Sequence, residues 1–173
     1  MNHKALHQTA TLLFCGALIS AITMNAPMPV AQFAGMVLIV VGLVGLFVVL
    51  DQESGRPGWS GRVGTATAVV ALALYGVLQA GDGWERAPEG IRWFESGLRR
   101  YHSFMLGLAI AMSGVAIDRT PGIPRALAFL MAACGIAYLV QGWTMPAKGF
   151  VGIISLVLWS GWLLVIAWRS QRT

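Results

Sequence analysis

The residues best suited to chemistry lie where a long apolar segment begins, just past the middle of the chain. They are Arg92, Glu95, Arg99 and His102. On an α-helix their spacing places all four on one stripe, because residues three, four and seven positions apart share a face. A carboxylate held by two guanidinium groups beside an imidazole can bind an anion or move a proton. The same stripe can also be a simple ladder of surface ion pairs, each contributing little.

Other polar side chains are expected at a similar depth once the apolar segments are laid across a bilayer. Amide, phenol and imidazole groups gather in one half of the spans, whereas the opposite half offers mostly hydroxyl groups. This distribution predicts a shallow cavity that opens on one face of the membrane. The expected ligand-binding residues are Tyr75, Gln79, Arg92, Glu95, Arg99, His102, Tyr138 and Gln141. The general preference of such side chains for the membrane surface would give the same pattern.

Familiar catalytic and metal-binding motifs are missing from the sequence. It contains no glycine-rich phosphate loop, no Gly-x-Ser-x-Gly, no His-Glu-x-x-His and no acidic metal cluster. Cys15 and Cys134 lie far apart and form no Cys-x-x-Cys motif. We therefore expect no metal site and no cofactor. If the protein is an enzyme, Glu95 and His102 are the candidate catalytic residues.

Composition indicates the elements that position these residues. Hydrophobic residues make up 57% of the chain and charged residues 11%, against roughly 25% charged in an average soluble domain. Long runs carry no charge, and the longest is divided by Asn25-Ala26-Pro27-Met28-Pro29, a strong helix stop. Each resulting segment has about the 20 residues that a helix needs to cross a bilayer. The sequence predicts an all-α bundle of six transmembrane helices in a single domain, residues 1–173, with helices near 5–24, 30–50, 63–81, 90–117, 124–143 and 149–169.

Charges flanking the spans predict the orientation of the chain. Alternating the loops places seven of the 12 lysine and arginine residues on the side of the N-terminus. This bias predicts that both termini are cytoplasmic and that the protein crosses the inner membrane several times. The net charge of +5 is explained by these flanking residues, so we expect no nucleic-acid partner. Pro88 suits the first turn of a helix, which makes the fourth helix longer than the membrane is thick.

Two features of the termini bear on organisation. The first span starts like a secretory signal peptide. Met24, however, occupies a position where the small-x-small cleavage site needs a small residue, so we expect the helix to be retained. Segments 1–50 and 119–169 share a weak sequence similarity, or echo, at an offset of 119 residues. It is visible in Cys15-Gly16 and Cys134-Gly135. Chance identity between two glycine-rich apolar segments is the simpler explanation. No inverted repeat is visible.

A motif in the fourth segment carries a resemblance to a known group of proteins. Residues 91–101 read Ile-Arg-Trp-Phe-Glu-Ser-Gly-Leu-Arg-Arg-Tyr, and Gly107-Leu108-Ala109 follow. This stretch resembles a bacterial family of small six-span membrane proteins of unknown function, in which an Arg-Trp-x-Glu-x-Gly segment precedes the fourth span. The loop at 118–125 and Gly135 are similar too. The resemblance implies a six-span inner-membrane protein and brings no activity with it.

Three classes of function stay open from the sequence. The favoured hypothesis is a protein that binds membrane lipids, a small hydrophobic ligand or a partner, which could be a second copy or another membrane protein, through its outer half. The second is a small intramembrane enzyme that uses Glu95 and His102 as acid and base. The third is a channel or facilitator, which would need a continuous polar path.

Overall fold

The computed structural model describes residues 3–23, 28–54, 58–80, 88–120, 123–144 and 150–169. Nearly all of these residues are helical and none forms a strand, which confirms the predicted all-α fold. The six helices are α1 (His3–Thr23), α2 (Pro29–Ser54), α3 (Trp59–Ala80), α4 (Glu89–Asp118), α5 (Arg125–Thr144) and α6 (Phe150–Arg169).

Helix ends follow local chemistry rather than the limits of the apolar runs. Proline occupies the first position of α2 and the cap of α4, where a missing N–H removes no helical hydrogen bond. At the α2–α3 connection, Oδ1 of Asp51 accepts a hydrogen bond of 3.1 Å from the backbone N–H of Gly58. There α2 runs four residues beyond the predicted limit and α3 starts four residues earlier, because polar residues outside the hydrocarbon can continue a helix.

Length and composition of the helices fit a membrane bundle. Five of the helices are long and apolar enough to cross a bilayer, and the described apolar stretch of α5, Arg125–Val140, is shorter. Large apolar side chains also cover the outside of the bundle: Val30 is 82% exposed, Phe129 73% and Leu158 69%. This much exposed apolar surface needs lipid around it. The protein is therefore an integral membrane protein of the helical-bundle class.

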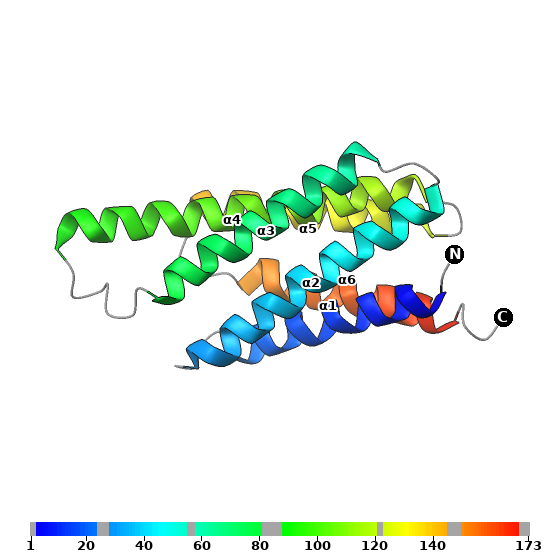
Figure 1. Cartoon of the computed structure of the whole chain (residues 1–173), viewed down its shortest axis with the longest axis horizontal. Helices are drawn as coiled ribbons and strands as arrows, with labels where there is room; N and C mark the ends of the chain where they lie inside the picture. The colour runs from blue at the N-terminus through cyan, green and yellow to red at the C-terminus, as the bar shows by residue number, and fades with distance from the viewer. Residues whose placement is uncertain are drawn as a thin grey trace.

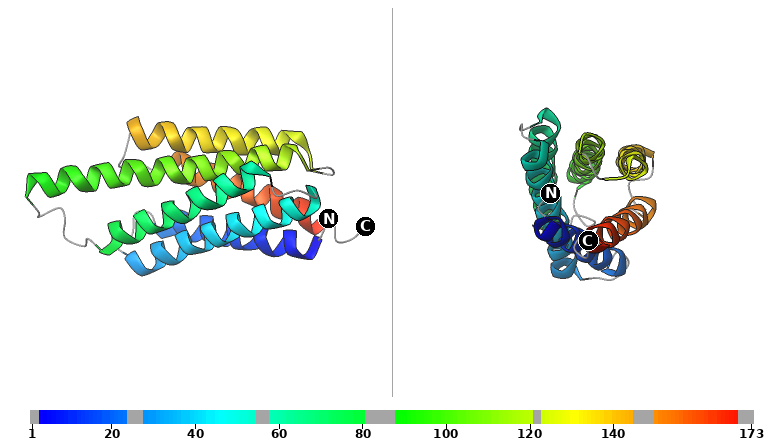
Figure 2. Two further views of the ribbon diagram at one scale, coloured as in Figure 1. Left: turned by 45° about the horizontal axis from the view of Figure 1, so that its top comes forward. Right: turned by 90° about the vertical axis from the view of Figure 1, so that its right-hand side faces the viewer.

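The helices form a ring in chain order (Figures 1 and 2). Each helix packs beside the next, and α6 returns to pack beside α1, while α2 also contacts α4. The start of α1 and the end of α6 lie at one end of the bundle (Figure 1). We call the opposite end the outer end, after the predicted orientation. There the first turns of α4 project beyond the other helices (Figure 1).

Glycine sets how closely the helices approach. In the α4–α5 pair, a Cβ added at Gly135 would lie 2.5 Å from the backbone nitrogen of Ala111 and 2.6 Å from the carbonyl oxygen of Gly107. In the α1–α2 pair, a Cβ at Gly16 would lie 2.7 Å from the carbonyl oxygen of Gly35. Small residues let transmembrane backbones come this close, where van der Waals packing replaces the hydrophobic effect. By contrast, α5 and α6 contact each other least among neighbours in the ring.

Candidate functional site

His102 joins α4 to α3 inside the bundle. Its side chain is 7% exposed, and Nδ1 lies 2.9 Å from the carbonyl oxygen of Ala71. Because a carbonyl can only accept, Nδ1 carries the proton of this hydrogen bond. Ala71 lies about midway along α3, so the imidazole is deeper than the membrane edge at which the spacing predicts it. Ionisable side chains are rare at such depth in a membrane, so His102 is a candidate functional residue.

An aromatic row extends from His102 across two further helices. The ring of Tyr75 on α3 lies 5.1 Å from the His102 ring, centroid to centroid, at a tilt of 37°. On its other side Tyr75 stacks on Phe33 of α2, at 6.4 Å and 6°. Both separations lie in the favourable range for ring pairs. The row therefore connects α2, α3 and α4 at one level of the bundle.

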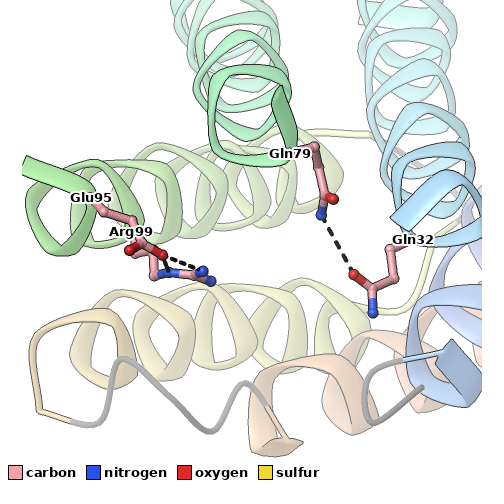
Figure 3. A network of polar contacts seen from close by, with 4 residues as sticks. All are labelled: Gln32, Gln79, Glu95 and Arg99. Atoms are coloured by element: carbon pink, nitrogen blue, oxygen red, sulfur yellow. Dashed lines mark hydrogen bonds and ion pairs between the residues drawn. The ribbon is translucent and has the colours of Figure 1, made fainter. Parts of the chain in front are cut away.

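Amide groups continue this polar layer towards the outer end. Gln79, one turn beyond Tyr75 on α3, interacts with the tyrosine side chain. Its Nε2 also donates to Oε1 of Gln32 on α2 across 3.5 Å, a long hydrogen bond (Figure 3). Gln32 in turn donates from Nε2 to the carbonyl oxygen of Thr23, the last residue of α1, at 2.7 Å. The amides thus connect the outer ends of three helices.

The charged stripe on α4 is only partly joined to this layer. Nε and Nη2 of Arg99 donate to Oε1 of Glu95 at 2.8 and 2.6 Å (Figure 3). The Arg99 side chain is 54% exposed, yet its charge is close enough to act on both Tyr75 and His102. Arg92 is exposed, and in the described part of the chain no ion pair connects it to Glu95. Glu95 is therefore held by Arg99 alone of the two predicted guanidinium groups.

Glu95 and His102 do not converge as an acid–base pair. Seven residues separate them along α4, which is about 10 Å of helix rise. Each side chain also has its own partner, Arg99 for the carboxylate and the Ala71 carbonyl for the imidazole. The arrangement is suited to holding a polar group in place, and it brings no proton donor and acceptor together.

The predicted residues of α5 have different surroundings. Tyr138 is 7% exposed, and its ring packs on Gly152 of α6, where an added Cβ would clash with ring carbon Cδ2. Its side chain is near enough to Tyr75 for an electrostatic interaction, although α3 and α5 make no direct contact among the described residues. The side chain of Gln141 lies outside the described part of the structure.

Three contributors to this layer escape the sequence analysis as site residues: Gln32, Phe33 and the carbonyl group of Ala71. Gln32 carries a weak signal, since it is an amide at the start of an apolar span. Phe33 and Ala71 resemble every other apolar residue in their helices. Their roles depend on which helices become neighbours, and the linear pattern contains no information on that point.

We name the group formed by Gln32, Tyr75, Gln79, Arg99 and His102 the outer polar layer. It belongs to a helical-bundle membrane protein, the class that the fold and composition define. No family model matches the chain, and no curated protein and no solved structure matches it either. The function must therefore be argued from the geometry.

Proposed function

We propose that this protein is a multi-pass inner-membrane protein that binds a lipid, or a small hydrophobic ligand with an anionic head, through its outer half. One observation carries the proposal: three neighbouring helices contribute to one polar layer, with a cation at its outer edge and neutral groups beneath it. An amphiphile likewise has a charged head at one end and less polar groups along the rest of its length. Membership of the resembling bacterial family remains part of this proposal.

Arg99 is the group expected to receive the head of the ligand. Guanidinium offers five N–H donors in a planar fork, and Glu95 receives bonds from Nε and Nη2 of Arg99. The remaining donors can bind phosphate or carboxylate oxygens with charge-assisted hydrogen bonds. Tyr75 and Gln79, both half-buried, can complete the contact with neutral groups.

The experiment compares two variants that remove the same charge from the same helix. Protein is extracted into lipid nanodiscs from its own membrane, and the retained lipids are identified by native mass spectrometry. We expect Arg99→Gln to retain roughly tenfold less anionic lipid, the usual effect of losing a charged hydrogen bond. Arg92→Gln should retain as much as the parent protein, because Arg92 is exposed and does not pair with Glu95. Equal retention by all three proteins would refute the proposal.

No specific observation favours either of the other two functions, an intramembrane enzyme or a channel. The separation of Glu95 from His102 gives no support to acid–base catalysis. A polar channel is opposed by the inner half of the bundle, where Leu43, Leu46, Phe47, Leu50 and Ile117 are each at most 1% exposed. This apolar packing argues against a continuous polar path through the described part of the bundle.

A further inference from the structure

The least packed seam of the bundle contains a cavity. Between α5 and α6, where neighbouring helices contact each other least, lies a groove of about 420 Å³. Ala133 and Ala137 line it from α5, and Leu158, Trp159 and Trp162 line it from α6. This volume falls within the range of small-molecule sites, roughly 300–1,000 Å³. None of these residues belongs to the outer polar layer.

Trp159, one of the residues that line the groove, has an unsatisfied polar group. The side chain is 3% exposed, and its Nε1 has no hydrogen-bond partner. Buried indole N–H groups usually find an acceptor. Trp159 lies near the middle of α6, about 15 Å of helix rise from either end. Bilayer water cannot reach this depth, so the acceptor must come from the protein or from a ligand.

The position of Trp159 restricts the chemistry of that ligand. An acyl chain offers no acceptor, and the ester carbonyls of a phospholipid stay near the headgroups, far from the middle of the membrane. The acceptor must therefore belong to the apolar body of a molecule that lies within the hydrocarbon. A ring carbonyl of a quinone satisfies both conditions.

We propose that the α5–α6 groove binds a membrane-soluble quinone, with one ring carbonyl accepting a hydrogen bond from Nε1 of Trp159. The hydrocarbon tail lies against Ala133 and Ala137 and continues into the lipid. The indole nitrogen is covered by neighbouring atoms, so the seam must widen slightly for the carbonyl to reach it. Among neighbours in the ring, α5 and α6 share the fewest contacts in the described part of the chain, so this seam is the easiest to widen.

The test uses decylubiquinone and the full-length protein in nanodiscs made without quinone. Binding is followed by quenching of tryptophan fluorescence, and the concentration at half-saturation is compared among variants. Trp159→Phe keeps an aromatic ring and removes the donor, so binding should weaken about tenfold. The matched control Trp93→Phe removes an exposed tryptophan of α4 that lies outside the groove, and its midpoint should stay unchanged. Unchanged binding in Trp159→Phe would overturn the hydrogen bond and with it the proposal.

Two further measurements locate the site and the recognised group. Ala133→Phe fills the groove and should abolish binding; if that variant does not fold, as judged by gel filtration and circular dichroism, Ala137→Leu replaces it. Full binding in a folded filled-groove variant would place the quinone elsewhere and overturn the proposal. Decylbenzene, which lacks a carbonyl, should displace the quinone poorly, and equal displacement would show that the groove recognises only hydrocarbon.

The quinone site stands apart from the lipid site proposed above. Arg99→Gln should bind decylubiquinone like the parent protein, and Ala133→Phe should retain anionic lipid. If Arg99→Gln lost both ligands, the two sites would be one and the separate groove site would be refuted. If Arg99→Gln retained both, the lipid proposal alone would fail.

Discussion

At the scale of single residues, His102 has the most specific environment of the predicted site residues. It is buried, hydrogen-bonded to the backbone of another helix and in contact with an aromatic ring. The stripe Arg92–Glu95–Arg99–His102 therefore has two different ends. Its outer part contains an ion pair between half-buried Glu95 and exposed Arg99, and its inner end is a buried link between helices.

Replacing His102 should expose the strength of this link. We expect His102→Phe to lower the free energy of unfolding by about 0.5–1.5 kcal/mol, the net contribution of one intramolecular hydrogen bond. The larger cost of an orphaned acceptor does not apply, because the Ala71 carbonyl keeps its place in α3. Thermal unfolding in mild detergent measures the change. His7→Phe, on half-buried His7 of α1, is the control and should change stability by less than about 0.5 kcal/mol. Equal effects of the two substitutions would show that the Ala71 bond contributes nothing particular.

At the scale of elements, α4 combines two environments in one helix. Its 30 residues correspond to about 45 Å of rise, against about 30 Å of hydrocarbon. Near its outer end, Gly90 and Gly97 would meet no atom within 4 Å if they carried a Cβ, whereas Gly107 and Gly114 would meet backbone atoms of α5 at 2.7 Å. The outer part of α4 therefore has no close neighbours at these glycines. The remainder packs so closely on α5 that no added methyl group would fit.

Two glycine substitutions should separate these environments. Gly135→Ala would push a methyl group into the backbone of α4, and we expect a loss of about 1–3 kcal/mol from overpacking. Gly97→Ala has open space, so we expect unchanged or slightly higher stability, since alanine favours a helix by roughly 0.5–1 kcal/mol over glycine. Unfolding in detergent followed by circular dichroism distinguishes them. A tolerated Gly135→Ala would contradict the close α4–α5 crossing.

At the scale of the whole molecule, the ring places the predicted cytoplasmic ends together and sends the overlong end of α4 to the other face (Figure 2). The echo between the first and last hairpins gains no support from this arrangement. Gly16 packs on α2, its neighbour in the first hairpin, whereas Gly135 packs on α4 and not on α6. Equivalent positions of a true repeat would make equivalent contacts.

The orientation of the ring can be tested by labelling single cysteines. Cys15 and Cys134 are first replaced by alanine, and Gly90→Cys or Gln52→Cys is then introduced at exposed positions. With both termini cytoplasmic, a membrane-impermeant maleimide should label Gly90→Cys in cells whose outer membrane is permeabilised. Gln52→Cys should react only after the inner membrane is opened. The reverse pattern would place the termini outside.

The sequence by itself determined the helices and the class of protein. The uncharged runs are interrupted by proline, glycine and polar residues. These interruptions predict every helix end to within four residues of its position in the structure. The reason is local: each backbone polar group must be satisfied within its own helix in lipid, so an apolar run of sufficient length becomes a helix. Tyr75, Gln79 and His102 could be found for the same reason, because polar side chains are conspicuous in apolar runs.

The tertiary structure alone decided the neighbours of each helix. It paired His102 with Ala71 rather than with Glu95, joined Gln79 to Gln32, and left Trp159 beside a groove. Apart from the charged outer part of α4, the helices are apolar around most of their circumference, so hydrophobicity cannot select which face meets which partner. Selection comes from close packing between helices far apart in the chain. That packing depends on shape in three dimensions, which a linear pattern does not record.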